Sequence, residues 1–131
     1  MNPVRRLLIV DDEADFAAFV AEVGTRLGFT ATPTTTAAAF RAAYLDAPPE
    51  VIVLDVVMPE KDGIETVQWL IDQGCRARVI VVSGYNPTYA SAARLLGEMM
   101  GRLQISMLQK PVSVTELRAH LLGTAGQNPS G

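Results

Sequence analysis

The sequence predicts an α/β fold, a doubly wound parallel sheet of five strands with five helices. Two observations predict it. Short aliphatic runs alternate with longer segments whose apolar residues recur at helical spacing. Runs such as Leu7–Val10 and Val51–Leu54 are apolar at every position, which is typical of strands buried on both faces. Strands that alternate with helices imply right-handed crossovers and helices on both faces of the sheet.

The five strands are predicted from these runs in chain order. We expect them at Leu7–Val10, Thr30–Thr34, Val51–Leu54, Val79–Val82 and Gln104–Leu108. The second run is short of apolar residues and contains a proline, so we place it at an edge of the sheet.

The helices are predicted from apolar spacing and from residues that favour helix ends. The first helix carries Phe16 to Leu27 and ends at Gly28 as a left-handed cap, and the second spans Ala37–Leu45. The third carries Ile64, Val67, Leu70 and Ile71, the fourth begins at Asn86-Pro87 and ends near Gly101, and the fifth opens with the capping-box spacing of Ser113 and Glu116.

Composition limits the class of protein. With 131 residues, 49% of them hydrophobic, the chain fits one globular domain over residues 1–123 and a flexible tail or linker stub over 124–131. The net charge of −3 argues against direct nucleic-acid binding. A single cysteine, Cys75, excludes an internal disulfide and a cysteine zinc site and fits the reducing cytoplasm. No segment is long and apolar enough to enter a membrane.

Reactive side chains follow four of the predicted strands. They are Asp11 and Asp12, Asp55, Ser83, and Lys110. Because ligands in open α/β sheets bind beyond the carboxyl ends of the strands, we expect these groups to lie together. Three carboxylates at about 5 Å repel one another by roughly 3 kcal/mol per pair at an effective dielectric near 20. Such a cluster favours a hard divalent cation such as Mg²⁺. Each residue alone fits an ordinary cap or turn; the combination predicts a site.

These residues resemble the receiver domain of two-component response regulators, in a single-domain, chemotaxis-regulator-like form. The resemblance covers roughly Val4 to Leu122. It is carried by the acidic pair, the stretch Asp55 to Gly63 with the pattern D-x-x-M-P-x-x-D-G, the Ser83-Gly84 pair and Lys110-Pro111. It implies a flavodoxin-like sheet with strand order 2-1-3-4-5.

The resemblance also implies a chemistry. Asp55 is the expected phosphoacceptor, taking a phosphoryl group from a phosphohistidine as an aspartyl phosphate. Asp12, Asp55 and the backbone carbonyl of Val57 are the expected Mg²⁺ ligands, and Asp11 acts largely through water. Only phosphotransfer and autodephosphorylation are expected, so the chain is not interpreted as an enzyme.

Further roles follow from the same resemblance. Lys110 pairs with Asp55 and then with a phosphoryl oxygen, while Ser83 and the N–H of Gly84 bind another. The Lys110–Pro111 peptide bond is expected to be cis. The implied partners are a histidine kinase or phosphotransfer protein and a downstream effector protein. The effector would bind the surface of the fourth helix, fifth strand and fifth helix, which also offers a route to a homodimer.

One residue, one spacing and two residues beside the phosphoryl site set this chain apart within the resemblance. Met107 stands where an aromatic switch residue is usual, and we interpret it as a core methionine. Ser83 and Lys110 are 27 positions apart, several more than usual, so the fourth helix or the loop after it is expected to be longer. Val57 and Tyr85 lie two positions after Asp55 and Ser83, and we hypothesise that they shield the phosphoryl group from water.

Two other functions remain open from the sequence. One is a Mg²⁺-dependent phosphohydrolase with an aspartyl-phosphate intermediate, although such enzymes usually carry a second acid where this chain has Val57. The other is a receiver-like interaction scaffold that is never phosphorylated. Formation of an Asp55-dependent phosphoryl adduct separates the receiver from the scaffold, and rapid turnover of small phosphate esters would instead favour the phosphohydrolase.

Overall fold

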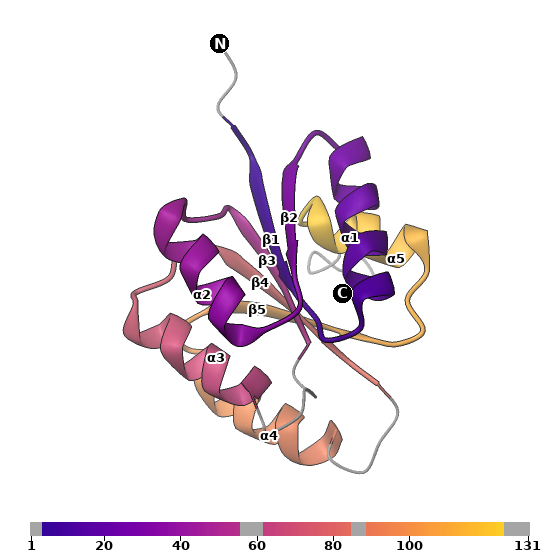
Figure 1. The fold of residues 1–131 in the computed structure, drawn as a ribbon. Helices are drawn as coiled ribbons and strands as arrows, with labels where there is room; N and C mark the ends of the chain where they lie inside the picture. Colours follow the sequence, from indigo (N-terminus) through magenta and orange to yellow (C-terminus); the bar gives the residue numbers. More distant parts are fainter. Residues whose placement is uncertain (1–3, 56–61, 85–88, 125–131) are drawn as a thin grey trace.

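The computed structural model describes residues 4–55, 62–84 and 89–124. Within these residues the chain forms five parallel strands in the order β2-β1-β3-β4-β5, with five helices around them (Figure 1). The predicted fold class and strand order are therefore confirmed.

The strands lie close to their predicted positions. In chain order the elements are β1 Arg6–Val10, α1 Ala14–Arg26, β2 Thr30–Thr34, α2 Ala37–Asp46, β3 Val51–Asp55, α3 Asp62–Asp72, β4 Arg78–Ser83, α4 Tyr89–Met99, β5 Gln104–Gln109 and α5 Val114–Leu121. Strand bounds differ from the predicted ones by at most one residue at each end, because apolar runs mark the buried part of a strand closely.

Helices cover both faces of the sheet, α1 and α5 on one face and α2, α3 and α4 on the other (Figure 1). Alternate residues of each inner strand point to opposite faces. In β1, Leu7 and Ile9 join the core under α1 and α5, while Leu8 and Val10 join the core under α2, α3 and α4. This alternation explains why the inner strands are apolar at every position.

The predicted helix ends are confirmed where the structure describes them. Gly28 has φ +98° after α1, and Ser113 and Glu116 form the reciprocal capping box of α5. The expected start of α4 at Asn86-Pro87 lies outside the described residues. Of the expected tail, only Thr124 is described, and its N–H donates to the Ala119 carbonyl at 2.9 Å.

The edge position of β2 is also confirmed, and this strand fixes the end of β1. The Thr34 hydroxyl donates to the Ile9 carbonyl at 2.6 Å, and the Asp11 N–H donates to the Thr34 carbonyl at 3.1 Å. These bonds hold the residue that follows β1 in place. Among the described residues, no helix has the length and apolar character needed to cross a bilayer.

Candidate functional site

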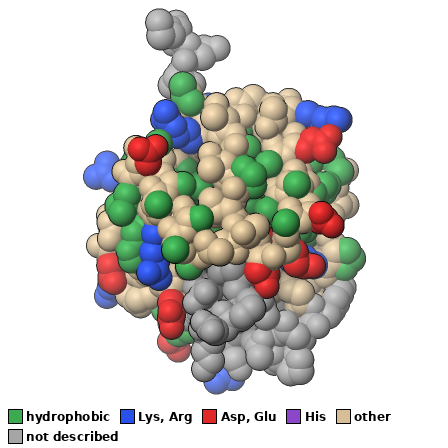
Figure 2. Space-filling view, in the orientation of Figure 1, with side chains coloured by type: hydrophobic (Ala, Val, Ile, Leu, Met, Phe, Trp, Pro, Cys, Tyr) green, Lys and Arg blue, Asp and Glu red, His purple; other side chains and the backbone are tan. Residues whose placement is uncertain are grey.

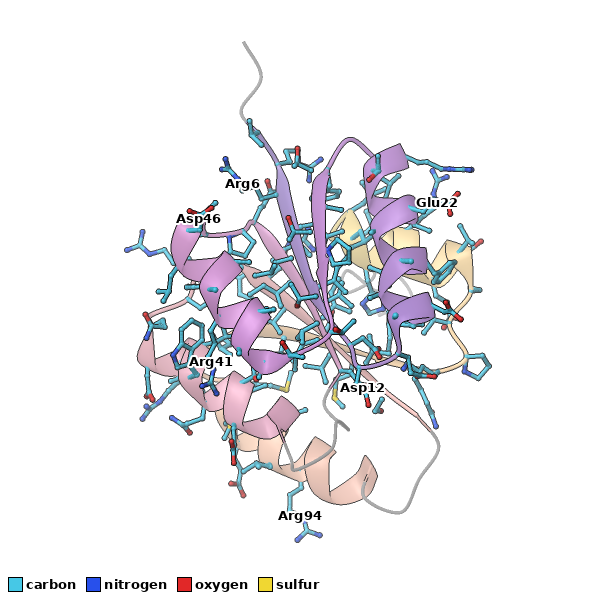
Figure 3. All side chains as sticks on the ribbon, viewed as in Figure 1. Arg6, Asp12, Glu22, Arg41, Asp46 and Arg94 are labelled. Atoms are coloured by element: carbon cyan, nitrogen blue, oxygen red, sulfur yellow. The ribbon has the colours of Figure 1, made fainter. Side chains whose placement is uncertain are left out.

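The polar side chains predicted from the strand ends come together at one edge of the sheet. Asp11 follows β1, Asp55 ends β3, Ser83 ends β4 and Lys110 follows β5. All four strands run parallel, so their carboxyl ends lie on the same side. Figure 3 shows Asp12 at this edge and Arg6, from the start of β1, at the opposite end of the molecule.

Three carboxylates form a cluster at this edge. One oxygen each from Asp11, Asp12 and Asp55 lies within 4.8 Å of the others. Asp11 and Asp55 are buried and Asp12 is exposed, so the cluster opens to solvent on one side. Figure 2 shows acidic side chains gathered here, where α1 begins. A donor set made only of carboxylate oxygens suits a hard divalent cation.

Lys110 lies against this cluster and contacts three carboxylates. Its Nζ is 3.1 Å from Asp11 Oδ2 and 3.8 Å from Asp55 Oδ2, and it forms a third ion pair with Glu13. The same ammonium lies 4.4 Å from the ring centroid of Phe16. A cation over an aromatic face gains about 0.5–1 kcal/mol at exposed sites. The ammonium is therefore held between α1 and the acidic cluster.

The backbone at Lys110 is fixed as well. Its N–H donates to the Ser83 carbonyl at 2.7 Å, which joins the ends of β4 and β5. The peptide bond between Lys110 and Pro111 is cis.

For both Asp11 and Lys110, burial and the neighbouring opposite charges shift the pKa in opposite directions. Burial raises the pKa of Asp11 above its usual range, although the hydrogen bond from the Glu13 N–H and the nearby Lys110 both oppose the change. Burial lowers the pKa of Lys110, but its bonds to Glu13 and Asp11 and the charges of Asp11 and Asp55 outweigh burial, so the pKa is raised. The lysine is therefore a persistent cation.

The Ser83 hydroxyl is buried and has no hydrogen-bond partner among the described residues. A buried hydroxyl without a partner is unusual and calls for an explanation, such as a role in binding. Next to it, a methyl group built on Gly84 would meet no atom of the described residues within 4 Å. Within these residues, the site therefore offers a hydroxyl without a hydrogen-bond partner beside uncrowded backbone.

The structure describes only some of the other residues named from the sequence. Val57 and Tyr85 lie outside the described residues. Met107, on β5, is partly buried and packs against the core under α2, α3 and α4. Cys75 is buried in that same core. The single histidine of the sequence, His120, lies on α5, and its Nδ1 is 3.0 Å from the Ser106 hydroxyl.

Two contacts of the site were not predicted. Glu13 was not expected at the site, and Phe16 was expected only among the apolar residues of the first helix. Both come from the start of α1 and contact Lys110. The available signal was that Glu13 follows the acidic pair directly, at the edge where Lys110 was expected.

The comparison with protein families decides the class of this chain. A family model described as response regulator receiver domain matches residues 7–122. The chain belongs to this family. Receiver domains of two-component response regulators are signalling modules, mostly not enzymes, and they work with kinases and downstream effector domains.

Related proteins of bacteria share this receiver domain. The photosynthetic apparatus regulatory protein RegA of Rhodobacter capsulatus is 29% identical over 118 residues, 90% of this chain and 61% of RegA. The chemotaxis protein CheY of Thermotoga maritima is 29% identical over 80 residues, 60% of this chain and 67% of CheY. This chain thus spans about three fifths of the length of RegA.

Solved structures show the same fold. A response regulator from Colwellia psychrerythraea matches with a TM-score of 0.75 at 25% identity, over 96% of this chain and 100% of that one. The receiver domain of a putative Luxo repressor from Vibrio parahaemolyticus matches with a TM-score of 0.77 at 16% identity, over 95% and 92% of the two chains.

Proposed function

We propose that this receiver domain accepts a phosphoryl group on Asp55 from a phosphohistidine of a partner kinase or phosphotransfer protein. The supporting observation is the convergence of groups around this carboxylate. Asp11 and Asp12 lie beside it, Lys110 reaches it at 3.8 Å, and Ser83 offers a buried hydroxyl on the next strand. Phosphoryl transfer depends mainly on positioning and on neutralising charge, which these groups supply.

The reaction needs no other nucleophile. A carboxylate oxygen of Asp55 attacks phosphorus, the new O–P bond forms as the N–P bond to the imidazole breaks, and the imidazole keeps the electron pair and takes up a proton from solvent. The Lys110 ammonium, the Ser83 hydroxyl and the Gly84 N–H donate hydrogen bonds to the phosphoryl oxygens. The phosphoryl group carries about −1.5 to −2 charges, and the Asp55 carboxylate loses its single charge on forming the bond. The site therefore gains about −0.5 to −1 charge, which the lysine balances.

Asp11, Asp12 and Asp55 are the residues that would hold Mg²⁺. By resemblance, Asp12 and Asp55 ligate directly together with the Val57 carbonyl, and Asp11 acts through water. When bound, the ion neutralises charge on the phosphoryl oxygens. The fit is supported by the three carboxylates, whose mutual repulsion a divalent cation relieves.

The output is proposed to be a change in the surface of α4, β5 and α5. Movement of the Ser83 hydroxyl toward the phosphoryl group would shift the chain before α4, and Met107 on β5 would repack in place of an aromatic residue. That surface would bind a downstream effector or a second copy of the chain. Moving such a switch from 1:99 to 99:1 requires about 5.5 kcal/mol of preference for one state.

The test is a search for one Asp55-dependent adduct. The protein is incubated with acetyl phosphate and Mg²⁺ and its intact mass is measured. We expect a single added phosphoryl group that Asp55→Asn abolishes and that the control Asp46→Asn, at the far end of α2, leaves unchanged. Absence of the adduct would favour the unphosphorylated scaffold. Rapid turnover of small phosphate esters would favour the phosphohydrolase.

A further inference from the structure

Glu13 has no part in the proposed transfer, yet it contacts the lysine that does. The ion pair between Lys110 and Glu13 is shorter than those of Lys110 with Asp11, at 3.1 Å, and Asp55, at 3.8 Å. The ammonium therefore lies nearer to two other carboxylates than to the proposed phosphoacceptor. One of these, Glu13, is not a member of the acidic cluster.

The backbone fixes Glu13 beside the cluster. Its N–H donates to Asp11 Oδ1 at 2.8 Å, which shapes the turn between β1 and α1. Glu13 is the N-cap of α1, but its side chain makes no capping hydrogen bond. The carboxylate is thus available to Lys110, and its replacement by an amide removes no cap.

Lys110 does not depend on Glu13 to stay at the site. Buried Asp11 holds the ammonium from one side and the Phe16 ring lies 4.4 Å from it. The Glu13 side chain is 65% exposed, whereas the Lys110 side chain is 17% exposed. Loss of the Glu13 charge would therefore leave the lysine at the site and remove only the attraction of its ammonium toward Glu13.

We infer that Glu13 is a positioning residue that competes with Asp55 and the incoming phosphoryl group for Lys110, and so slows phosphorylation. This inference rests on the proposed function. A cation held by the acidic cluster neutralises the cluster's charge, whereas Lys110 is the one cation that pairs with Glu13 among the described residues. The lysine must leave Glu13 to follow the phosphoryl oxygen, and this separation adds to the barrier.

The experiment compares Glu13→Gln with Asp15→Asn. Asp15 is an exposed acid in the first turn of α1 and has no ion pair among the described residues, so both variants lose one charge at the same helix end. Initial rates of adduct formation with acetyl phosphate and Mg²⁺ are measured by intact mass. Affinity for beryllofluoride, which mimics a bound phosphoryl group without turnover, is measured by titration.

For Glu13→Gln we expect both the rate and the beryllofluoride affinity to rise about twofold to fivefold, the range for loss of one exposed ion pair. Asp15→Asn should match the wild-type protein. Unfolding in urea without phosphodonor should give the same stability for both variants, which separates positioning of Lys110 from a structural role.

Three results would overturn the inference. An unchanged or slower Glu13→Gln protein would show that the ion pair does not compete with transfer. An equal gain in Asp15→Asn would assign the effect to general charge. If the wild-type protein forms no adduct, the proposed function fails and this inference fails with it. The wild-type protein and Asp55→Asn would then both lack the added phosphoryl mass, which distinguishes this failure from the other two.

Discussion

The carboxylates around Lys110 differ widely in burial, and this difference determines what each of them contributes to stability and to function. Asp11 and Asp55 are buried, whereas Glu13 is exposed. A buried charge that loses its partner costs far more than an exposed one. A change of charge beside Lys110 therefore affects stability more at Asp11 than at Glu13, and Glu13 affects function more than stability.

Replacement of Asp11 by asparagine should stabilise the protein without a divalent cation at neutral pH. The raised pKa means that the folded state disfavours the charged carboxyl, so its favourable contribution is present below about pH 3.8 and is lost as the pH rises through the higher folded pKa. Asparagine keeps an oxygen for the Glu13 N–H. Urea unfolding should show a larger gain at pH 7 than at pH 4, and an equal gain at both would contradict this.

Replacement of Ser83 by alanine should leave the free energy of unfolding unchanged or raise it slightly. The buried hydroxyl has no partner among the described residues, so its removal loses no hydrogen bond and relieves the desolvation of a polar group. Urea unfolding checks this expectation. Phosphorylation of the variant by acetyl phosphate should be slower, and a stability loss above about 2 kcal/mol would reveal a missed partner.

At this scale, the sequence predicted which residues meet but not which pair is nearest. The strand ends placed Asp11, Asp55 and Lys110 at one edge because parallel strands share a direction. The ion pair with Glu13 depends on the turn after β1, which the bond from the Glu13 N–H to Asp11 shapes. A turn of this kind is determined by hydrogen-bond geometry that apolar spacing does not encode.

At the scale of elements, α1 approaches the sheet closely because Gly24 has no side chain. A methyl group at Gly24 would clash with a methyl of Leu7 on β1, and Leu7 is buried in the core under α1 and α5. Gly97 on α4 is exposed, and a methyl group built there would meet no atom of the described residues within 4 Å. Two helical glycines thus differ in what surrounds them.

Alanine at these two glycines should have opposite effects. Gly97→Ala should raise the free energy of unfolding by about 0.5–1 kcal/mol, since alanine favours the helix. Gly24→Ala gains the same helix preference, but overpacking against Leu7 costs about 1–3 kcal/mol and should lower the free energy. Urea denaturation measures both. Equal stabilisation would mean that Leu7 moves aside freely.

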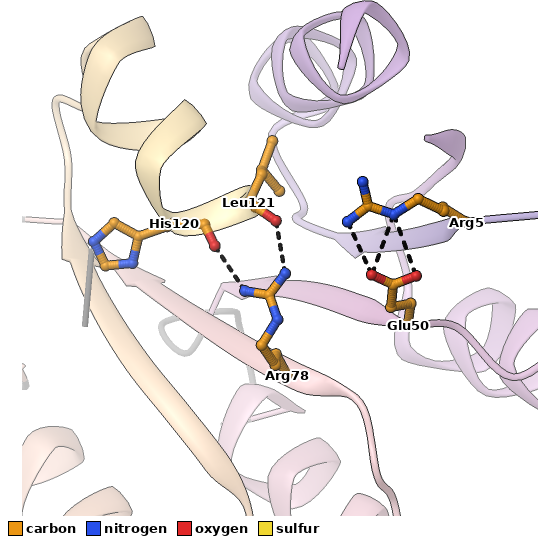
Figure 4. A network of polar contacts seen from close by, with 5 residues as sticks. All are labelled: Arg5, Glu50, Arg78, His120 and Leu121. Atoms are coloured by element: carbon orange, nitrogen blue, oxygen red, sulfur yellow. Dashed lines mark hydrogen bonds and ion pairs between the residues drawn. The ribbon is translucent and has the colours of Figure 1, made fainter. Parts of the chain in front are cut away.

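The end of α5 is held by Arg78 of β4 (Figure 4). The guanidinium donates to the His120 carbonyl at 2.9 Å and to the Leu121 carbonyl at 2.7 Å. These carbonyls lie in the last turn of the helix, where acceptors lack partners within the helix and the dipole favours a positive charge. The nearby pair of Arg5 and Glu50 is more exposed and joins two side chains.

Arg78→Met should therefore destabilise the protein by about 1–3 kcal/mol, because methionine keeps an apolar stem but leaves both carbonyls without their charged donor. The matched control Glu50→Gln removes the exposed ion pair and should cost no more than about 1 kcal/mol. Urea unfolding gives both values. Hydrogen exchange should also become faster in α5. Equal costs would argue against a capping role for Arg78.

The sequence predicted the strands better than contacts such as that of Arg78. Apolar runs report burial directly, so Val51–Asp55 and its neighbours were located to within a residue. The contact of Arg78 with α5 joins positions 42 and 43 residues apart and depends on the packed fold. Likewise, the capping box of Ser113 was predictable because both partners lie within one turn.

At the scale of the whole molecule, the fold places three carboxylates together at one edge, and Lys110 neutralises their negative charge only in part. Four strands must be parallel and adjacent for Asp11, Asp12, Asp55 and Lys110 to meet. Repulsion within the cluster opposes folding, and a bound cation should remove that opposition. Ligand binding to the folded state alone stabilises it by mass action.

Addition of Mg²⁺ should accordingly raise the melting temperature. At about ten times the dissociation constant the gain is about 1.4 kcal/mol, or about 3–6 °C for a domain of this size. Calorimetry measures the rise, a chelator should reverse it, and Asp12→Asn should remove most of it. An equal rise with KCl at matched ionic strength would assign the effect to screening instead.

Pro33 has a consequence for how copies of this domain meet. The Thr34 carbonyl points toward β1, where it accepts from the Asp11 N–H. Because neighbouring residues of a strand alternate in direction, the backbone nitrogen and carbonyl of Pro33 point away from β1, toward the unpaired edge of β2. Proline has no N–H to offer there. An extended segment from another molecule that aligned with β2 would find a missing donor, which discourages edge-to-edge association and the fibrous growth that begins with it.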